Sequence, residues 1–193
     1  TPLEGLIMGT RCGDIDPALV LYLMDTMGLT PEEMDSLLNK KSGMLGLSGI
    51  SHDMREIEGR AIEGDPRASL ALGIYCQRIK KYIGAYYAAM GRIDALVFTG
   101  GIGEHAAEIR ARVCERFQWL GLALDNAANQ SHAALISTAG SCCNRRNCVI
   151  GYKAINLQIP IIVYEFQTCV LLKVVFNSFC EEHTHVGGSK RRI

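Results

Sequence analysis

Apolar residues recur along this chain at two spacings, and each run begins and ends at residues that typically bound helices or strands. Residues 17–27 show the helical spacing, with apolar side chains at Leu19, Val20, Leu23, Met24 and Met27. Asp16 and Pro17 precede this run and Gly28 follows it, which is the order of an N-cap, a first helical residue and a helix stop. The pattern predicts an amphipathic helix between Pro17 and Gly28.

Two further helices are predicted from similar start signals. Thr30-Pro31-Glu32-Glu33 is a capping box with proline at the first helical position. Asp65-Pro66 precedes the longest helical pattern, which runs to about Met90. Its apolar stripe predicts a buried face or a subunit interface and comprises Leu70, Ile74, Ile79, Tyr82, Ile83 and Tyr86. Residues 39–49 are rich in glycine and serine, so we expect a loop there.

The most informative local pattern is a change from strand to helix near residue 100. The apolar run at 95–98 predicts a buried strand, and a helical pattern follows from Glu104 to about Trp119. Between them lie Gly100, Gly101 and Gly103. Because glycine has no Cβ and the first N–H groups of a helix favour an anion, this segment suits the close approach of a nucleotide. A tight turn without a ligand has the same pattern, so both interpretations stay open at this point.

Composition limits the class of protein. Of 193 residues, 48% are hydrophobic and 21% are charged, which is typical of a globular domain and not of a disordered segment. Twenty basic residues balance twenty acidic ones, so no basic field indicates a nucleic acid or a membrane surface as a partner. The first residues carry neither a positive segment nor an apolar run, so we expect no secretory signal and a cytoplasmic location. The chain does not begin with Met, and we expect it to be a piece of a longer protein.

The eight cysteines are unevenly distributed. Cys12, Cys76 and Cys114 are isolated beside apolar residues, so we expect buried, reduced thiols. The other five lie in the last quarter of the chain, at Cys142, Cys143, Cys148, Cys169 and Cys180. No pair among these five has C-x-x-C spacing, and we therefore expect no zinc site.

Three multi-residue segments follow one another in a specific order: Thr1–Pro17, Ser48–Arg55 and Leu96–His105. In this order they resemble the carboxyl-terminal half of the acetokinase family, and the resemblance runs from Thr1 to about Ala139. The resemblance implies an α/β fold like that of actin and the sugar kinases, of which this chain carries the C-terminal domain of two. It also implies that a nucleotide binds in the cleft between the two domains.

Arg11 is the candidate catalytic residue. It lies between Gly9 and Gly13, just before the first predicted helix, and its guanidinium offers paired donors to phosphate or carboxylate oxygens. The resemblance implies that Arg11 stabilises the transition state of phosphoryl transfer and contacts acetate. The alternative is a surface arginine that pairs with Asp14 or Asp16.

Two segments are candidates for nucleotide binding. By resemblance, Asp53, Met54 and Arg55 line an adenosine pocket, in which Arg55 stacks on the purine. The alternative for these residues is a helix-start cluster capped by Ser51. The resemblance also assigns nucleotide contacts to a second segment, consisting of Gly101, Ile102, Gly103, Glu104 and His105. His105 stands where most members of the resembled family have asparagine, so we expect the nucleotide affinity to depend mildly on pH.

The resemblance ends near residue 140, and we divide the chain there into a nucleotide-binding domain at 1–139 and a divergent tail at 140–193. The family continues with a strand and a turn whose glutamate helps to hold magnesium, and the tail contains no such turn. We attribute the tail to a shifted reading frame, an unprocessed intron or a fusion. Its apolar run at 159–176 is interrupted by Glu165, Gln167 and Lys173, so buried strands are favoured over a membrane span.

The resemblance implies acetate kinase chemistry, in which a phosphoryl group passes between ATP and acetate with Mg²⁺, or propionate kinase chemistry with a longer acyl group. It implies ATP or ADP and a small acyl substrate as ligands, and a second copy of the chain as a partner in a homodimer. The family's phosphate loops and magnesium glutamate have no counterpart in these 193 residues, so we expect them to be inactive on their own. The alternative is a catalytically silent module that binds nucleotide or dimerises.

Overall fold

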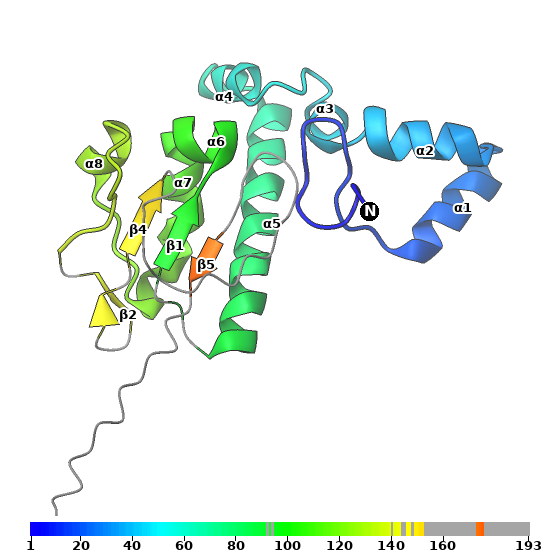
Figure 1. Ribbon diagram of the computed structural model, residues 1–193. Helices are drawn as coiled ribbons and strands as arrows, with labels where there is room; N and C mark the ends of the chain where they lie inside the picture. The colour runs from blue at the N-terminus through cyan, green and yellow to red at the C-terminus, as the bar shows by residue number, and fades with distance from the viewer. Residues whose placement is uncertain are drawn as a thin grey trace, which may run out of the picture.

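The computed structural model describes residues 1–91, 93, 95–139, 141–143, 146–147, 149–152 and 173–175, with the backbone alone from residue 142 onward. The long helix α5 (Pro66–Met90) runs through the middle of the molecule, with a small sheet and its helices on one side and α1, α2 and α3 on the other (Figure 1). Within these residues, no helix combines the length and the apolar character that a bilayer crossing requires.

The first two helices begin and end where the capping signals predict. Helix α1 (Pro17–Met27) is capped by the Asp16 carboxylate, which accepts from the Ala18 N–H at 2.9 Å, and it ends at Gly28 with a φ of 64°. Helix α2 (Pro31–Lys40) begins with both hydrogen bonds of the Thr30–Glu33 capping box. The apolar spacing of α1 is not matched by burial, because no residue of this helix is buried.

The loop predicted at 39–49 is wrong, because α2 continues to Lys40 and a further helix, α3 (Gly43–Ser48), follows. The N-terminus of α3 has no side-chain cap. Instead, the N–H groups of Met44 and Leu45 donate to the carbonyl oxygens of Met8 and Gly9 at 2.8 and 2.9 Å. A segment distant in sequence thus supplies the acceptors that a helix N-terminus needs, and local sequence does not reveal this.

Helix α5 forms the centre of the hydrophobic core. It begins at the predicted Asp65 cap, ends at Gly91, and packs against α3, α4 (Met54–Ile62) and α7 (Ala107–Cys114). Of the predicted stripe, Ile79 and Ile83 are buried, whereas Leu70 is 61% exposed. The buried face is shifted from the predicted one and comprises Ala68, Ala71, Leu72, Tyr75, Cys76, Ile79 and Ile83.

The three isolated cysteines are free thiols, as expected. Cys76 and Cys114 are buried, and burial raises the pKa of Cys76 to about 11 and that of Cys114 to about 12. Cys12 is only half-buried. The pairing and environment of the other five cysteine side chains lie outside the described residues.

The central strand β1 (Ala95–Phe98) is buried along its whole length and matches the predicted strand. It pairs in parallel with β4 (Val149–Tyr152) and antiparallel with β5 (Lys173–Val175), so that Ala95 lies opposite both Val149 and Val175. A separate antiparallel pair joins β2 (Cys142–Cys143) to β3 (Arg146–Asn147). Strand β5 falls inside the apolar run at 159–176, and the other residues of that run lie outside the described part of the chain.

The single helix predicted from Glu104 to Trp119 is wrong in its start and its continuity. The glycine segment is itself helical, as α6 (Gly100–His105), and the chain leaves helical geometry at Ala106 before α7 begins. A 3₁₀-helix (Glu115–Leu120) and α8 (Asn126–Gln130) follow. Gly103 packs on the end of β1, where a Cβ would lie 3.2 Å from the carbonyl carbon of Phe98. This close approach of α6 to β1 favours a residue without a side chain, because a Cβ would push the two elements apart by a few tenths of an ångström.

Candidate functional site

A pocket of about 490 Å³ lies between the N-terminal end of α4 and helix α6. It is lined by two segments that are almost fifty residues apart in sequence: His52, Asp53, Met54, Arg55 and Glu58 from the first, and Gly101, Ile102, His105 and Ala106 from the second. Its volume falls within the range of about 300–1,000 Å³ that is usual for small-molecule sites. Helix α5 packs against α4 and α7, and β1 leads directly into α6, so the core of the fold brings the two segments together (Figure 1).

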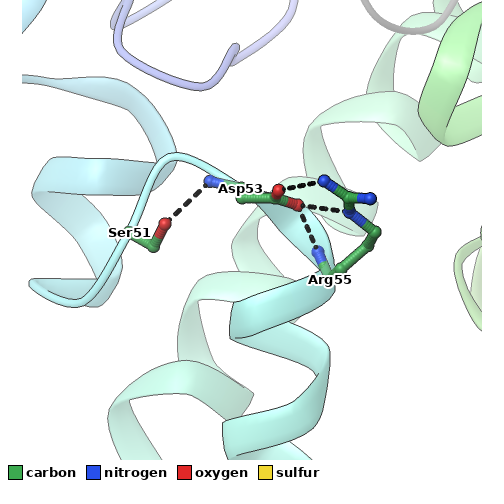
Figure 2. A network of polar contacts seen from close by, with 3 residues as sticks. All are labelled: Ser51, Asp53 and Arg55. Carbon is green, nitrogen blue, oxygen red and sulfur yellow. Dashed lines mark hydrogen bonds and ion pairs between the residues drawn. The ribbon is translucent and has the colours of Figure 1, made fainter.

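A compact polar network forms the α4 side of the pocket (Figure 2). Asp53 is the N-cap of α4, and its Oδ1 accepts from the backbone N–H and the Nε of Arg55 at 2.9 and 3.0 Å. The Arg55 Nη2 lies 2.5 Å from the other carboxylate oxygen. These hydrogen bonds hold the pKa of Asp53 down, to about 2. The alternative interpretation expected Ser51 to cap the helix, and this is wrong, because the N-cap is Asp53. The Ser51 hydroxyl accepts from the N–H of Asp53 at 3.0 Å.

Arg55 is well placed to meet a ligand from solvent. Its side chain is 88% exposed, while the bidentate contact with Asp53 fixes the direction of the guanidinium. The helix-start cluster that we considered as an alternative therefore does form, and it forms at the rim of the pocket. A guanidinium that is fixed in direction and open on its face is suited to stacking on a flat aromatic ring.

Only some residues of the second predicted segment, 101–105, line the pocket. Gly101, Ile102 and His105 line the pocket, and a Cβ on Gly101 would meet no atom of the described residues within 4 Å. Gly103 is buried against β1, and Glu104 does not line the pocket. The carbonyl oxygens of Gly103 and Glu104 both accept from Arg110 Nη1, at 2.9 Å each.

Sequence reasoning missed Arg110. Its side chain is fully buried, at 0% exposure, on the face of α7 that also carries Ile109, Val113 and Cys114. An arginine at an otherwise apolar position of a helix was the available signal, because a charged side chain is rarely fully buried without partners.

The structure places Arg11 at the end of a tight loop rather than in the pocket. The Met8 N–H donates to the Arg11 carbonyl at 3.1 Å, and Arg11 is not among the residues that line the pocket. It pairs with neither Asp14 nor Asp16, which are engaged elsewhere, and its guanidinium has no partner among the residues that the structure describes. The loop nevertheless borders the pocket, because a Cβ on Gly9 would lie 3.1 Å from the carbonyl oxygen of His52.

Two other pockets of the described structure lack the residues that the sequence singled out for nucleotide binding. A pocket of about 340 Å³ beside α7 is lined by charged residues including Glu108, Arg112 and Glu115, and by none of the residues that the sequence singled out for nucleotide binding. Across the described ranges, no group of three or more His, Cys, Asp or Glu side chains is arranged to hold a metal ion.

Comparison with known proteins shows the family to which most of the chain is similar. The profile of the acetokinase family matches residues 1–150, slightly beyond the boundary that we predicted near residue 140. The acetate kinase of Halothermothrix orenii is 55% identical over 131 residues, which cover 68% of this chain and 33% of that protein. The propionate kinase of Citrobacter rodentium is 52% identical over 136 residues, covering 70% and 34% of the two chains.

Solved structures agree with the sequence comparisons. The acetate kinase of Porphyromonas gingivalis superposes with a TM-score of 0.72 at 44% identity, over 80% of this chain and 39% of that one. A propionate kinase from Francisella tularensis gives the same TM-score at 40% identity. The chain spans about a third of the length of the curated relatives that it matches. Because the family profile covers well over half of its residues, the chain belongs to the acetokinase family.

Proposed function

We propose that the pocket between α4 and α6 receives the adenosine part of ATP or ADP, and that residues 1–139 form one of the two domains of an actin-like ATPase fold. The observation that supports this most directly is the convergence of two motifs, at 53–55 and 101–105, on one pocket of suitable volume. Each motif alone has a structural explanation, as a helix cap or as a tight glycine segment. Neither of these explanations requires the two segments to border a common cavity.

The proposed contacts follow from the side chains at the pocket. Arg55 lies at the rim with its guanidinium oriented by Asp53, and stacks on the face of the purine. Gly101 leaves its backbone open to the cavity and allows the sugar or the first phosphate to approach it closely. Arg11, on the neighbouring loop and without a described partner, is free to contribute positive charge to the transferring phosphoryl group.

The reaction that this site serves is phosphoryl transfer between ATP and a short carboxylate, acetate or propionate. Relatives of similar identity carry both names, at 55% for an acetate kinase and 52% for a propionate kinase. These residues match only about a third of the length of those relatives, so we expect nucleotide binding without turnover from residues 1–193 alone. A hydroxamate assay for the acyl phosphate tests that expectation, because product formation by the isolated chain would contradict it.

The described residues contain no group of three or more His, Cys, Asp or Glu side chains arranged to hold a metal ion. Mg²⁺ bound with a nucleotide needs only one or two carboxylates, because phosphate oxygens and waters supply its other ligands. We derive no step through the metal. The titration below supplies Mg²⁺ together with the nucleotide, whose own phosphate oxygens are suitable ligands.

A homodimer is the partner that we propose for this part of the fold. Several large apolar side chains of α1 are exposed, among them Leu21 at 70% and Tyr22 at 62%, and Leu70 at the start of α5 is 61% exposed. Such exposure favours an interface. Sedimentation velocity tests the proposal, and a monomer at all accessible protein concentrations would contradict it.

Calorimetric titration of the chain with ADP and Mg²⁺ tests the nucleotide site. Saturable binding is expected, and Arg55→Ala is expected to weaken it by about tenfold through loss of stacking. Arg60→Ala is the matched control, because Arg60 lies on the same helix, is exposed, pairs with Glu63 at 3.5 Å, and does not line the pocket. A well-folded chain that binds no nucleotide, or an equal loss in both variants, would overturn the proposed site.

A further inference from the structure

The guanidinium of Arg110 connects three separate parts of the structure around the pocket. Its Nη1 donates to the carbonyl oxygens of Gly103 and Glu104, both at 2.9 Å. Its Nε and Nη2 donate to the side-chain and backbone oxygens of Asn129 in α8, at 2.7 and 2.8 Å. Its Nη2 also lies 3.1 Å from Nδ1 of His132. One fully buried side chain therefore ties the end of α6 to α8 and to the loop that follows it.

The carbonyl groups that Arg110 binds are those that a helix leaves without partners. Helix α6 ends at His105, and Ala106 turns away with a ψ of 85°, so the chain offers no continuing helical N–H groups to the last carbonyls. Buried carbonyl groups need donors, and a cation at a helix C-terminus is also favoured by the helix dipole. An apolar residue at position 110 would fill the space but would leave these oxygens unsatisfied.

Arg110 also supports a pocket side chain indirectly. A guanidinium only donates hydrogen bonds, so the Nδ1 of His132 must be the acceptor in their contact. His132 has a φ of 53°, which is uncommon for a residue with a side chain and indicates that the surrounding contacts hold it in place. Its ring meets the ring of His105 edge to face, with the centroids 6.3 Å apart. His105 lines the pocket, so a line of contacts runs from Arg110 through His132 to the cavity.

We infer that Arg110 is the positioning residue of this pocket: it fixes the Gly101–Ala106 segment and the ring of His105 in the arrangement that receives the ligand, without touching the ligand. That the ligand is a nucleotide rests on the proposed function, whereas the positioning itself does not. Lysine cannot replace Arg110, because an ammonium group has its donors at one point and cannot span acceptors on both α6 and α8.

Hydrogen exchange of the full chain, measured with and without ADP and Mg²⁺, tests the inference in Arg110→Lys. We expect the amides of residues 101–106 to exchange at least about tenfold faster, while the buried amides of α5 keep their rates. We also expect nucleotide affinity to fall by about tenfold or more in this variant. Arg112→Lys is the matched control, since Arg112 lies on the same helix but its side chain is 38% exposed and pairs with Glu108 at 2.7 Å; both readouts should be unchanged.

The two readouts separate the possible failures. Faster exchange throughout α5 as well as at 101–106 would show that Arg110 stabilises the whole fold and would overturn a positioning role. Unchanged exchange at 101–106 would overturn it too, whether or not nucleotide binds. If the parent chain binds no nucleotide, the proposed function fails, but exchange still decides whether Arg110 positions the segment. Should Arg110→Lys not fold, Asn129→Ala removes the Oδ1 acceptor of Arg110 together with the Nδ2 donor to the Ala107 carbonyl, and is expected to loosen the same amides to a smaller extent.

Discussion

The hydroxyl of Tyr82 donates a hydrogen bond to the carboxylate of Asp14 and so joins the N-terminal loop to the centre of α5. Asp14 also accepts from the Gly5 N–H at 2.5 Å, and the guanidinium of Arg78 lies 3.7 Å from its Oδ2. Burial and the bond to Asp14 raise the pKa of Tyr82 above its ordinary value. Asp14 therefore anchors the loop that carries Arg11, and Arg11 itself is not part of the anchor.

Substitutions at Asp14 and Arg11 should consequently differ in their effect on folding. Arg11→Ala is expected to change the free energy of unfolding by no more than about 0.5 kcal/mol, because no described group loses a partner. Asp14→Ala is expected to lower it by about 1–3 kcal/mol, because the Tyr82 hydroxyl and the Gly5 N–H lose their acceptor. Urea unfolding measures both values. Equal losses would mean that Arg11 is also a structural residue.

Gly43 and Gly28 allow conformational strain to be separated from lack of space. Both have a left-handed backbone, with φ of 63° and 64°. Among the described residues, a Cβ on Gly28 would meet no other atom within 4 Å, whereas one on Gly43 would lie 2.7 Å from the carbonyl oxygen of Arg11. Gly28→Ala should therefore cost about 1–2 kcal/mol for the left-handed conformation alone.

Gly43→Ala should cost clearly more than Gly28→Ala, because a Cβ at this position overlaps backbone atoms that cannot rotate away. Urea unfolding of the two variants gives the difference directly. Equal losses would show that the Arg11 loop moves aside without penalty, and hence that its position beside α3 is not fixed by packing.

The contact between Asp53 and Arg55 predicts a pH dependence with a definite sign. The pKa of Asp53 is lowered to about 2 by its hydrogen bonds with Arg55. A lowered carboxyl pKa stabilises the folded state above the ordinary value of 3.8, and this stabilisation is lost as the pH falls from there towards 2. In a carboxyl NMR titration, Asp53 should titrate near pH 2 in the parent and closer to its ordinary value in Arg55→Ala. An unchanged midpoint would show that the pair does not persist in solution.

The carboxyl group of Glu58 predicts a pH dependence of folding stability with the opposite sign. One of its carboxylate oxygens is buried without a hydrogen-bond partner among the described residues, and burial, with the nearby Glu108, raises its pKa. The charged form of Glu58 is therefore unfavourable in the folded state. The folded state is consequently most stable with respect to this group at acidic pH, and it loses stability as the pH rises above about 4.5.

Glu58→Gln should accordingly raise the Tm at pH 7 by about 1–3 °C and give no gain at pH 4, since glutamine removes the charge. Glu56→Gln, at an exposed position of the same helix, is the control and should have no such effect. Thermal unfolding at the two pH values measures both. A gain at pH 7 that persists at pH 4 would rule out the buried charge as its cause.

Some features of this fold follow from residues close together in the chain. The caps at Asp16, Thr30 and Asp65 formed as predicted because a capping side chain binds N–H groups two or three residues away. The buried strand at 95–98 was also predictable, from four consecutive apolar residues. The motifs at 1–17, 48–55 and 96–105 were enough to indicate the family, which the profile match confirms.

Other features depend on contacts between segments that are far apart, and the residues involved do not show this locally. Helix α3 forms within a glycine- and serine-rich stretch because Met8 and Gly9 supply its N-terminal acceptors. In the sequence, Arg110 resembles an ordinary helical arginine. In the fold, α8 covers its side chain, and the end of α6 supplies carbonyl groups that accept its hydrogen bonds. Capping and strand propensity act over a few residues and so can be read from the amino-acid order. The shared pocket and its buried support required the packing of α4, α5 and α7 around β1, because burial is a property of the assembled fold.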